Sequence, residues 1–230
     1  MTRQSRHECI WASVYGRPNE YCGLFDFECA NCRFSAKQRR SEHESGRLYE
    51  LPASYWLSRE HLWLAPGPEG RCVIGIDHFL AESLQHVRSI IRPCTHSRLQ
   101  IGKHCVWLFD IFGTISLRAP VAGVVIRSNW DLIRQPTLIL THPYGLGWLF
   151  EVRAEGHWQE GLLKGGEAIA FIQRSRNMLR DKVVAAQATE GCTVAADGGG
   201  LALDAIHQTM PDTYFELLSE TITTGRAKTP

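Results

Sequence analysis

The chain has no excess of either charge and no long apolar runs. Twenty-five Lys and Arg residues face 24 Asp and Glu residues, for a formal net charge of +1. This balance gives no general electrostatic reason to bind nucleic acid or an anionic membrane. No apolar segment is long enough for a membrane span or for the core of a secretory signal peptide. The sequence therefore predicts a cytoplasmic protein without a membrane partner.

The common catalytic motifs are missing as well. The sequence contains no G-x-S-x-G, no G-x-x-x-x-G-K-[ST] and no H-E-x-x-H. The glycine run after Asp197 lacks the Lys and the hydroxyl of a phosphate-binding loop, so we expect a hairpin turn there. His78, His142 and His157 are expected at the surface or at helix caps. We therefore predict that the protein is not an enzyme.

Four of the eight cysteines crowd into the first 34 residues, which we expect to form a small module. Cys9, Cys22, Cys29 and Cys32 include one C-x2-C pair, whose two thiolates can face one ion. Cytosolic thiols rarely form structural disulfides, so the predicted ligand is zinc or an iron-sulfur cluster. The spacing fits neither a standard zinc ribbon nor a ferredoxin, and a dithiol redox pair or unliganded thiols remain alternatives.

The remaining four cysteines are scattered and are expected in the core: Cys72, Cys94, Cys105 and Cys192. Residues 35–54 form a polar connector that follows the cysteine module. It begins with a basic cluster, and a basic stretch beside a zinc module can bind nucleic acid. Glu42 and Glu44 follow immediately, so a solvated linker is favoured and a nucleic-acid partner is unlikely.

From residue 55 to 172 the sequence predicts a mainly β domain. Short β-rich runs are separated by Gly and Pro, which indicates a barrel or a sandwich. The runs are HLWLA, RCVIGI, HVRSII, VWLFDIF, ISLRAPV, GVVIRS, TLIL and WLFEVRA. Two short helices are expected, one from Asp77 to Gln85 with Asp77 as N-cap, and one around residues 157–163.

Residues 173–230 are expected to form a C-terminal α/β appendage. It comprises a helix through residues 174–179, a strand-turn-strand over residues 192–205 and a helix from about Asp212 to Thr221. In the last helix, Phe215, Leu218 and Ile222 share one face. We expect that face to dock on the β domain.

Three segments at matching mutual spacing carry a resemblance to a known family. They are Pro143-Tyr144-Gly145-Leu146-Gly147-Trp148-Leu149, Gln135-Pro136-Thr137-Leu138-Ile139 and Gly75-Ile76-Asp77-His78-Phe79. From Glu60 to Val152 the chain resembles the glycine cleavage system H protein. The resemblance implies a barrel-sandwich hybrid fold of the lipoyl-domain type. It also implies that the family's function is to carry a lipoyl group on one lysine.

The same resemblance places Phe112 at the position of that lysine. In the family the modified lysine follows a glycine by ten residues and precedes P-V-S-G by eight, and Gly102 and Pro120-Val121-Ala122-Gly123 keep this spacing. The family's E-S-V-K reads Phe109-Asp110-Ile111-Phe112 here. Phe has no amine to form the amide with lipoate, so no lipoate is expected at this position.

The sequence therefore favours a non-enzymatic interaction or adaptor subunit. Its expected contact residues are Phe109, Phe112, Tyr144 and Trp148. Its expected partner is a protein, with enzymes that recognise lipoyl or H-protein domains as candidates. One alternative is a redox or electron-transfer component that uses the N-terminal cysteines. Another is a lipoyl carrier that uses Lys103 or a different lysine.

Overall fold

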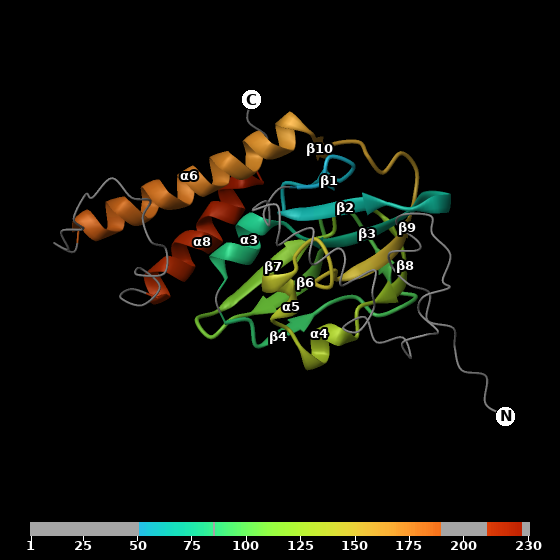
Figure 1. Cartoon of the computed structure of the whole chain (residues 1–230), viewed down its shortest axis with the longest axis horizontal. Coiled ribbons are helices and arrows are strands. Elements are labelled where there is room, and N and C mark those ends of the chain that lie inside the picture. The colour runs from blue at the N-terminus through green and yellow to red at the C-terminus, as the bar shows by residue number, and fades with distance from the viewer. Residues whose placement is uncertain (1–50, 85, 190–210, 227–230) are drawn as a thin grey trace, which may run out of the picture.

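A computed structural model describes residues 51–84, 86–189 and 211–226. The predicted cysteine module, nearly all of the connector and the predicted 192–205 hairpin lie outside these residues. Within them the chain forms two antiparallel sheets and a set of helices (Figure 1). The predictions of a mainly β domain and of helices in the C-terminal appendage are therefore confirmed, whereas the strands predicted in that appendage lie outside the described residues.

The larger sheet has seven strands in the order β10-β1-β2-β3-β9-β8-β5. Its strands are β1 (Trp56–Leu57), β2 (Leu62–Pro66), β3 (Arg71–Ile76), β5 (Arg98–Leu99), β8 (Gly123–Ser128), β9 (Phe150–Ala154) and β10 (Leu163–Lys164). A 3-10 turn, η3 (Pro68–Gly70), connects β2 to β3. Strands β2 and β3 are buried along almost their whole length, which explains their nearly continuous apolar sequences.

The smaller sheet has three strands in the order β4-β6-β7. These are β4 (Ser89–Ile91), β6 (His104–Phe109) and β7 (Thr114–Arg118). Ile115 and Leu117 of β7 are buried and alternate with more exposed neighbours, so one face of this sheet packs on the core. Strands β6 and β7 form a hairpin in which Phe109 pairs with Thr114.

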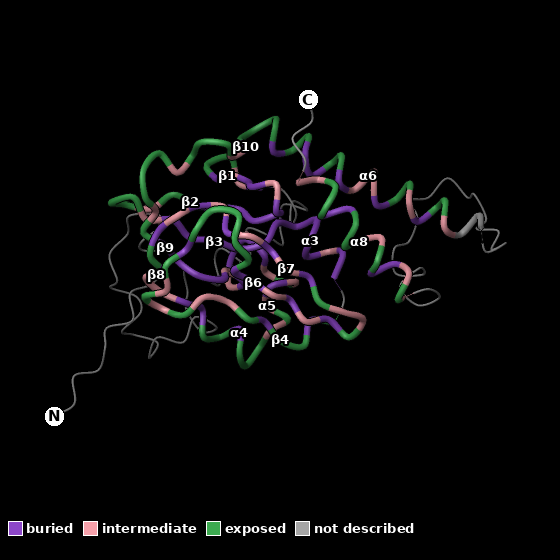
Figure 2. The backbone as a smooth tube through the Cα atoms, turned by 180° about the vertical axis from the view of Figure 1, so that it is seen from behind, coloured by how far each residue is buried: buried purple, intermediate pink, exposed green. Residues whose placement is uncertain are grey.

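Five helices complete the described structure: α3 (His78–Ser83), α4 (Asp131–Arg134), α5 (Leu138–Thr141), α6 (Gly166–Thr189) and α8 (Pro211–Gly225). The long helix α6 lies beside α8 and contacts α3 (Figure 1). The faces of α6 and α8 that meet the rest of the protein are buried, whereas their outer faces are exposed (Figure 2). Within the described ranges, none of these helices has the length and apolar character to span a membrane.

Most of the predicted helices and strands are present, but two of the predictions were wrong. The TLIL run forms helix α5 instead of a strand, because a short apolar run alone does not distinguish the two structures and the residue after Pro136 adopts a helical backbone. Residues around His157 form turns that lead into β10 rather than a helix. Helix α4 was not predicted. Asp77 caps α3 as expected, since its side chain accepts a hydrogen bond from the Leu80 amide.

Helix α8 confirms the prediction for the last helix. Its buried residues include Phe215, Leu218 and Ile222, and they recur at helical spacing. The predicted helix at residues 174–179 is also present, but it is part of the much longer α6. Because α6 begins at Gly166, the boundary predicted between residues 172 and 173 falls inside a continuous helix.

Candidate functional site

The tip of the β6–β7 hairpin is the place where the resemblance puts the lipoyl-lysine. The tip is a tight turn in which the Asp110 amide donates to the Gly113 carbonyl at 2.9 Å. Phe112 is half-buried there and packs against the core, with its ring edge-on to His86 at a centroid distance of 6.5 Å. Phe109 is half-buried on the outer face of the small sheet. Phe112 is therefore not a freely projecting side chain.

A buried carboxylate holds this tip in place. Asp110 accepts a hydrogen bond from the His86 amide at 2.9 Å and another from the Phe112 amide at 3.3 Å. These bonds tie the turn to the segment that precedes β4. The acidic residue therefore has a structural role that the spacing argument did not reveal.

Helix α8 covers the same tip from the other side. The ring of Phe215 lies so close to Gly113 that a Cβ atom at position 113 would collide with it. Near its end, Arg226 pairs with Glu60 at 2.8 Å and donates to the Ser116 carbonyl at 2.9 Å. The second oxygen of Glu60 accepts from the Arg118 amide at 3.1 Å. These contacts fasten α8 along β7.

Three lysines lie in the described residues, and none is at the tip. Lys103 precedes β6 at the opposite end of the hairpin, where its carbonyl accepts from the Ala119 amide at 2.8 Å. Lys164 lies over the ring of Trp56, 4.7 Å from its centroid. Lys182 pairs with Glu220 at 2.8 Å. An amide-forming amine is therefore missing from this turn.

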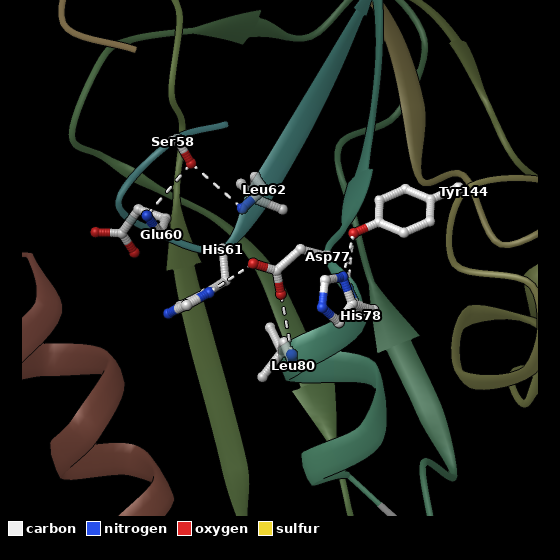
Figure 3. A network of polar contacts seen from close by, with 8 residues as sticks. All are labelled: Ser58, Glu60, His61, Leu62, Asp77, His78, Leu80 and Tyr144. Atoms are coloured by element: carbon white, nitrogen blue, oxygen red, sulfur yellow. Dashed lines mark hydrogen bonds and ion pairs between the residues drawn. The ribbon is translucent and has the colours of Figure 1, made fainter. Parts of the chain in front are cut away.

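A buried polar network joins the start of β2 to α3 (Figure 3). His61 has a left-handed backbone with φ 58, and its Nδ1 lies 2.7 Å from Oδ2 of Asp77. Both side chains are fully buried. The imidazole is held between two aromatic rings, Phe79 at 4.6 Å and Phe171 at 4.8 Å. The Ser58 hydroxyl accepts from two amides of the same turn, those of residues 60 and 62.

This pair has the histidine and the carboxylate of a catalytic triad, but it has neither the partner nor the accessibility that catalysis needs. Its other ring nitrogen, Nε2, is buried without a hydrogen-bond partner in the described part of the chain. With 0% exposure on both side chains, no substrate can reach the pair. Asp77 is already occupied as the cap of α3. The pair therefore stabilises the junction of β2, α3 and α6, and only the fold brings residues 61 and 77 together.

The Pro143–Leu149 segment also has a structural role. The Trp63 indole donates to the Pro143 carbonyl at 3.0 Å, and the Tyr144 hydroxyl lies 2.7 Å from Nδ1 of His78. Tyr144 is buried, and burial raises the pKa of its hydroxyl. A partner contact is therefore not proposed for Tyr144. His78 is also buried, and it directly follows the N-cap of α3, so of the two predicted locations, the surface and a helix cap, the surface one was wrong.

Trp148 is half-buried, and the guanidinium of Arg127 lies 5.6 Å from its ring centroid. Arg127 also pairs with the buried Glu151 at 2.8 Å. Trp148 thus keeps part of its ring accessible, and its predicted role in partner contact stays a prediction. The same holds for Phe109 and Phe112.

Comparison with known proteins places this arrangement in a family. The sequence profile described as Glycine cleavage H-protein matches residues 55–175. The chain belongs to the glycine cleavage H-protein family. Members of this family are carrier proteins rather than enzymes. The matched residues include both sheets and the first part of α6.

Two relatives agree with this assignment by sequence. The glycine cleavage system H protein of Thermobifida fusca is 34% identical over 102 residues, which are 44% of this chain and 80% of that protein. That of Streptomyces avermitilis is 31% identical and covers 44% of this chain and 82% of its own length. The crystal structure of the H protein from Mycobacterium marinum has 25% sequence identity and a TM-score of 0.47, covering 52% of this chain and 97% of that one.

Helix α8, at residues 211–225, lies beyond the residues that match the H-protein profile. The element that covers the hairpin tip is therefore additional to the family's own region. Its contact with Gly113 could not be read from the sequence. The only signal was the apolar face of the helix.

The predicted metal ligands Cys9, Cys22, Cys29 and Cys32 lie outside the described residues, and their zinc or iron-sulfur ligand stays a prediction. Inside the described ranges, no group of three or more His, Cys, Asp or Glu residues could hold a metal ion. Cys72 and Cys105 are buried as predicted, and burial raises the pKa of the Cys105 thiol to about 12. Cys94 is exposed, contrary to prediction, because it follows β4 in a surface loop.

Proposed function

We propose that this protein is a non-enzymatic member of the H-protein family that does not carry a lipoyl group and acts as an interaction or adaptor subunit. The observation that carries the proposal is the tip of the β6–β7 hairpin, where Phe112 is half-buried against the core and Ile111 is exposed. It offers no lysine, and the resemblance places Phe112 at the acceptor position. Lipoyl attachment needs a primary amine, so the residues at this tip do not fit the group.

The surroundings of the tip support the same proposal. A carrier needs its acceptor side chain exposed both to a modifying ligase and to the enzymes that use the arm. Here Phe215 of α8 lies against Gly113, and Phe112 packs toward the core. An arm attached at this turn would have to share that space with α8. The expected partners are proteins that recognise the H-protein surface, among which the enzymes of glycine cleavage are the natural first choice.

The test is the mass of the protein after exposure to the modifying enzyme. The full chain is incubated with a lipoate–protein ligase, ATP and lipoate, next to an H protein from Thermobifida fusca as positive control. We expect the control to gain one lipoyl group and this chain to keep its unmodified mass. Lys103→Arg is run in parallel as the matched variant.

A lipoyl adduct on the wild-type chain would contradict the proposal. If Lys103→Arg abolished that adduct, the alternative of a carrier with a displaced acceptor would be correct. If the adduct survived the substitution, peptide mapping would identify which other lysine carries it. The adaptor role is tested separately, by measuring direct binding of the purified chain to the purified enzymes of glycine cleavage.

A further inference from the structure

Three large apolar side chains are exposed where helix α4 meets strand β4. They are Ile91 at 52%, Trp130 at 62% and Ile133 at 62% exposure. Helix α4 contacts β4, and both backbone views show the two elements side by side (Figures 1 and 2). The Ser128 hydroxyl donates to the Pro93 carbonyl at 3.0 Å and joins the two flanking segments. We call Ile91, Arg92, Trp130 and Ile133 the α4 patch.

The patch is preorganised rather than a set of loose side chains. Leu132 is the one residue of α4 that is buried, so it anchors the helix. Trp130 and Ile133 are three residues apart and therefore lie on neighbouring positions of the helical turn. The guanidinium of Arg92 lies 5.5 Å from the Trp130 ring centroid, in the geometry of a cation–π contact. An exposed Trp beside Arg and Ile is typical of an interface centre.

Helix α4 carries two charges of opposite sign, and the patch also contains Arg92, whose guanidinium lies over the Trp130 ring. Asp131 begins α4 and Arg134 ends it, and both side chains are exposed. Neither forms an ion pair with another described residue of its own chain. When two copies of such a helix meet antiparallel across a twofold axis, the acidic end of each faces the basic end of the other.

We propose that the α4 patch is the contact through which two copies of this chain form a twofold symmetric dimer. A twofold contact uses the same surface on both copies, so an apolar centre flanked by opposite charges is the required pattern. Trp130 and Ile133 meet their counterparts at the centre, and each Asp131 faces Arg134 of the partner subunit. The proposal concerns a surface away from the hairpin tip and does not depend on the loss of the lipoyl group.

The size of the patch sets the strength of the contact. Three apolar side chains and their rim fall short of the roughly 800 Å² per partner that a standard stable interface buries. The dimer is therefore weak, with a dissociation constant on the order of micromolar. The fraction of chains in the dimer therefore rises with protein concentration.

The test is sedimentation velocity of the full chain between about 1 and 200 μM, a range that brackets such a constant. We expect the weight-average sedimentation coefficient to rise with concentration toward that of a dimer. Trp130→Ala and Ile133→Ser each raise the dissociation constant at least about tenfold. The matched control is Ile169→Ser, because Ile169 on α6 is 58% exposed and lies outside the patch. It leaves association unchanged.

Charge reversal tests the arrangement itself. Asp131→Arg and Arg134→Asp each place like charges opposite one another and weaken the dimer, whereas the double variant D131R/R134D restores it. The rescue fades at high salt, because exposed pairs are screened. A wild-type chain that stays monomeric throughout the concentration range overturns the proposal. So does a dimer that survives both Trp130→Ala and the single charge reversals.

Discussion

Phe215 of α8 and Gly113 at the β6–β7 tip fit together so closely that no side chain can be added at position 113. Gly113 does not have a left-handed backbone, so the restriction is one of space. We expect Gly113→Ala to lower the free energy of unfolding by about 1–3 kcal/mol through overpacking. Phe215→Ala removes the obstacle and costs about 3 kcal/mol on its own by leaving a cavity.

Urea unfolding of both variants and of the double variant measures this coupling. In G113A/F215A the alanine at position 113 fits into the space left by the ring. The double variant therefore loses less unfolding free energy than the sum of the losses in the two single variants. Gly166→Ala is the control, since nothing lies within 4 Å of a Cβ atom there and it changes stability by no more than about 0.5 kcal/mol. Strict additivity in the double variant would contradict the contact.

The cover over the tip also predicts how an introduced lysine behaves. Phe112→Lys restores an amine at the acceptor position, but α8 still occupies the neighbouring space. We expect a lipoate–protein ligase to modify F112K slowly and F112K/F215A at least about tenfold faster, since the second change opens the approach. Intact mass against time measures both rates.

The lysine variant needs a control for nonspecific modification. Arg118→Lys places a new amine on the same hairpin but away from its tip, and we expect no adduct there. Equal rates for F112K and F112K/F215A would show that α8 does not limit access. In that case the contact of α8 with the tip would no longer support the proposed loss of the carrier function, and only the missing amine would.

Strands with alternating or continuous apolar residues were predictable, because burial on one face or on both faces leaves that pattern in the sequence. The runs at residues 71–76 and 123–128 match β3 and β8 exactly. The pairing of His61 with Asp77 was not predictable, since it joins residues that only the sheet brings together. The exposed Trp130 left no signal either, because a four-residue helix is too short to show a period.

The buried His61–Asp77 pair should be important for stability. Asp77→Ala removes both the partner of the imidazole and the cap of α3, so we expect a loss of about 2–4 kcal/mol. Asp77→Asn keeps an oxygen for the cap and loses less. Asp181→Ala on the outer face of α6 is the control, because that side chain is 73% exposed, and it changes stability by no more than about 0.5 kcal/mol.

Chemical denaturation at neutral pH compares these variants. Losses of similar size in D77A and D181A would show that the buried pair is dispensable. A further readout is the far-ultraviolet circular dichroism of D77A, in which local loss of α3 would appear as a small decrease in helical signal. The outcome distinguishes a pair that contributes to stability from one that does not.

Tyr214 predicts how stability falls at alkaline pH. Burial raises the pKa of its hydroxyl from 10.0 to about 12, although a hydrogen bond with Ser83 opposes the shift. Between these values the unfolded chain releases the proton and the folded chain keeps it. Stability therefore falls as pH rises, by up to about 1.4 kcal/mol per pH unit for this group.

Tyr214→Phe removes that contribution, so we expect its unfolding free energy to fall less steeply than that of the wild type between pH 10 and 11.5. Cys105, whose pKa is raised to about 12, still titrates in the variant and keeps some slope. Phe215→Leu is the matched control, because it replaces a neighbouring buried ring that has no proton to lose. It lowers stability equally at every pH. Parallel slopes for Tyr214→Phe and the wild type would mean that the hydroxyl is not protected by burial in the folded state.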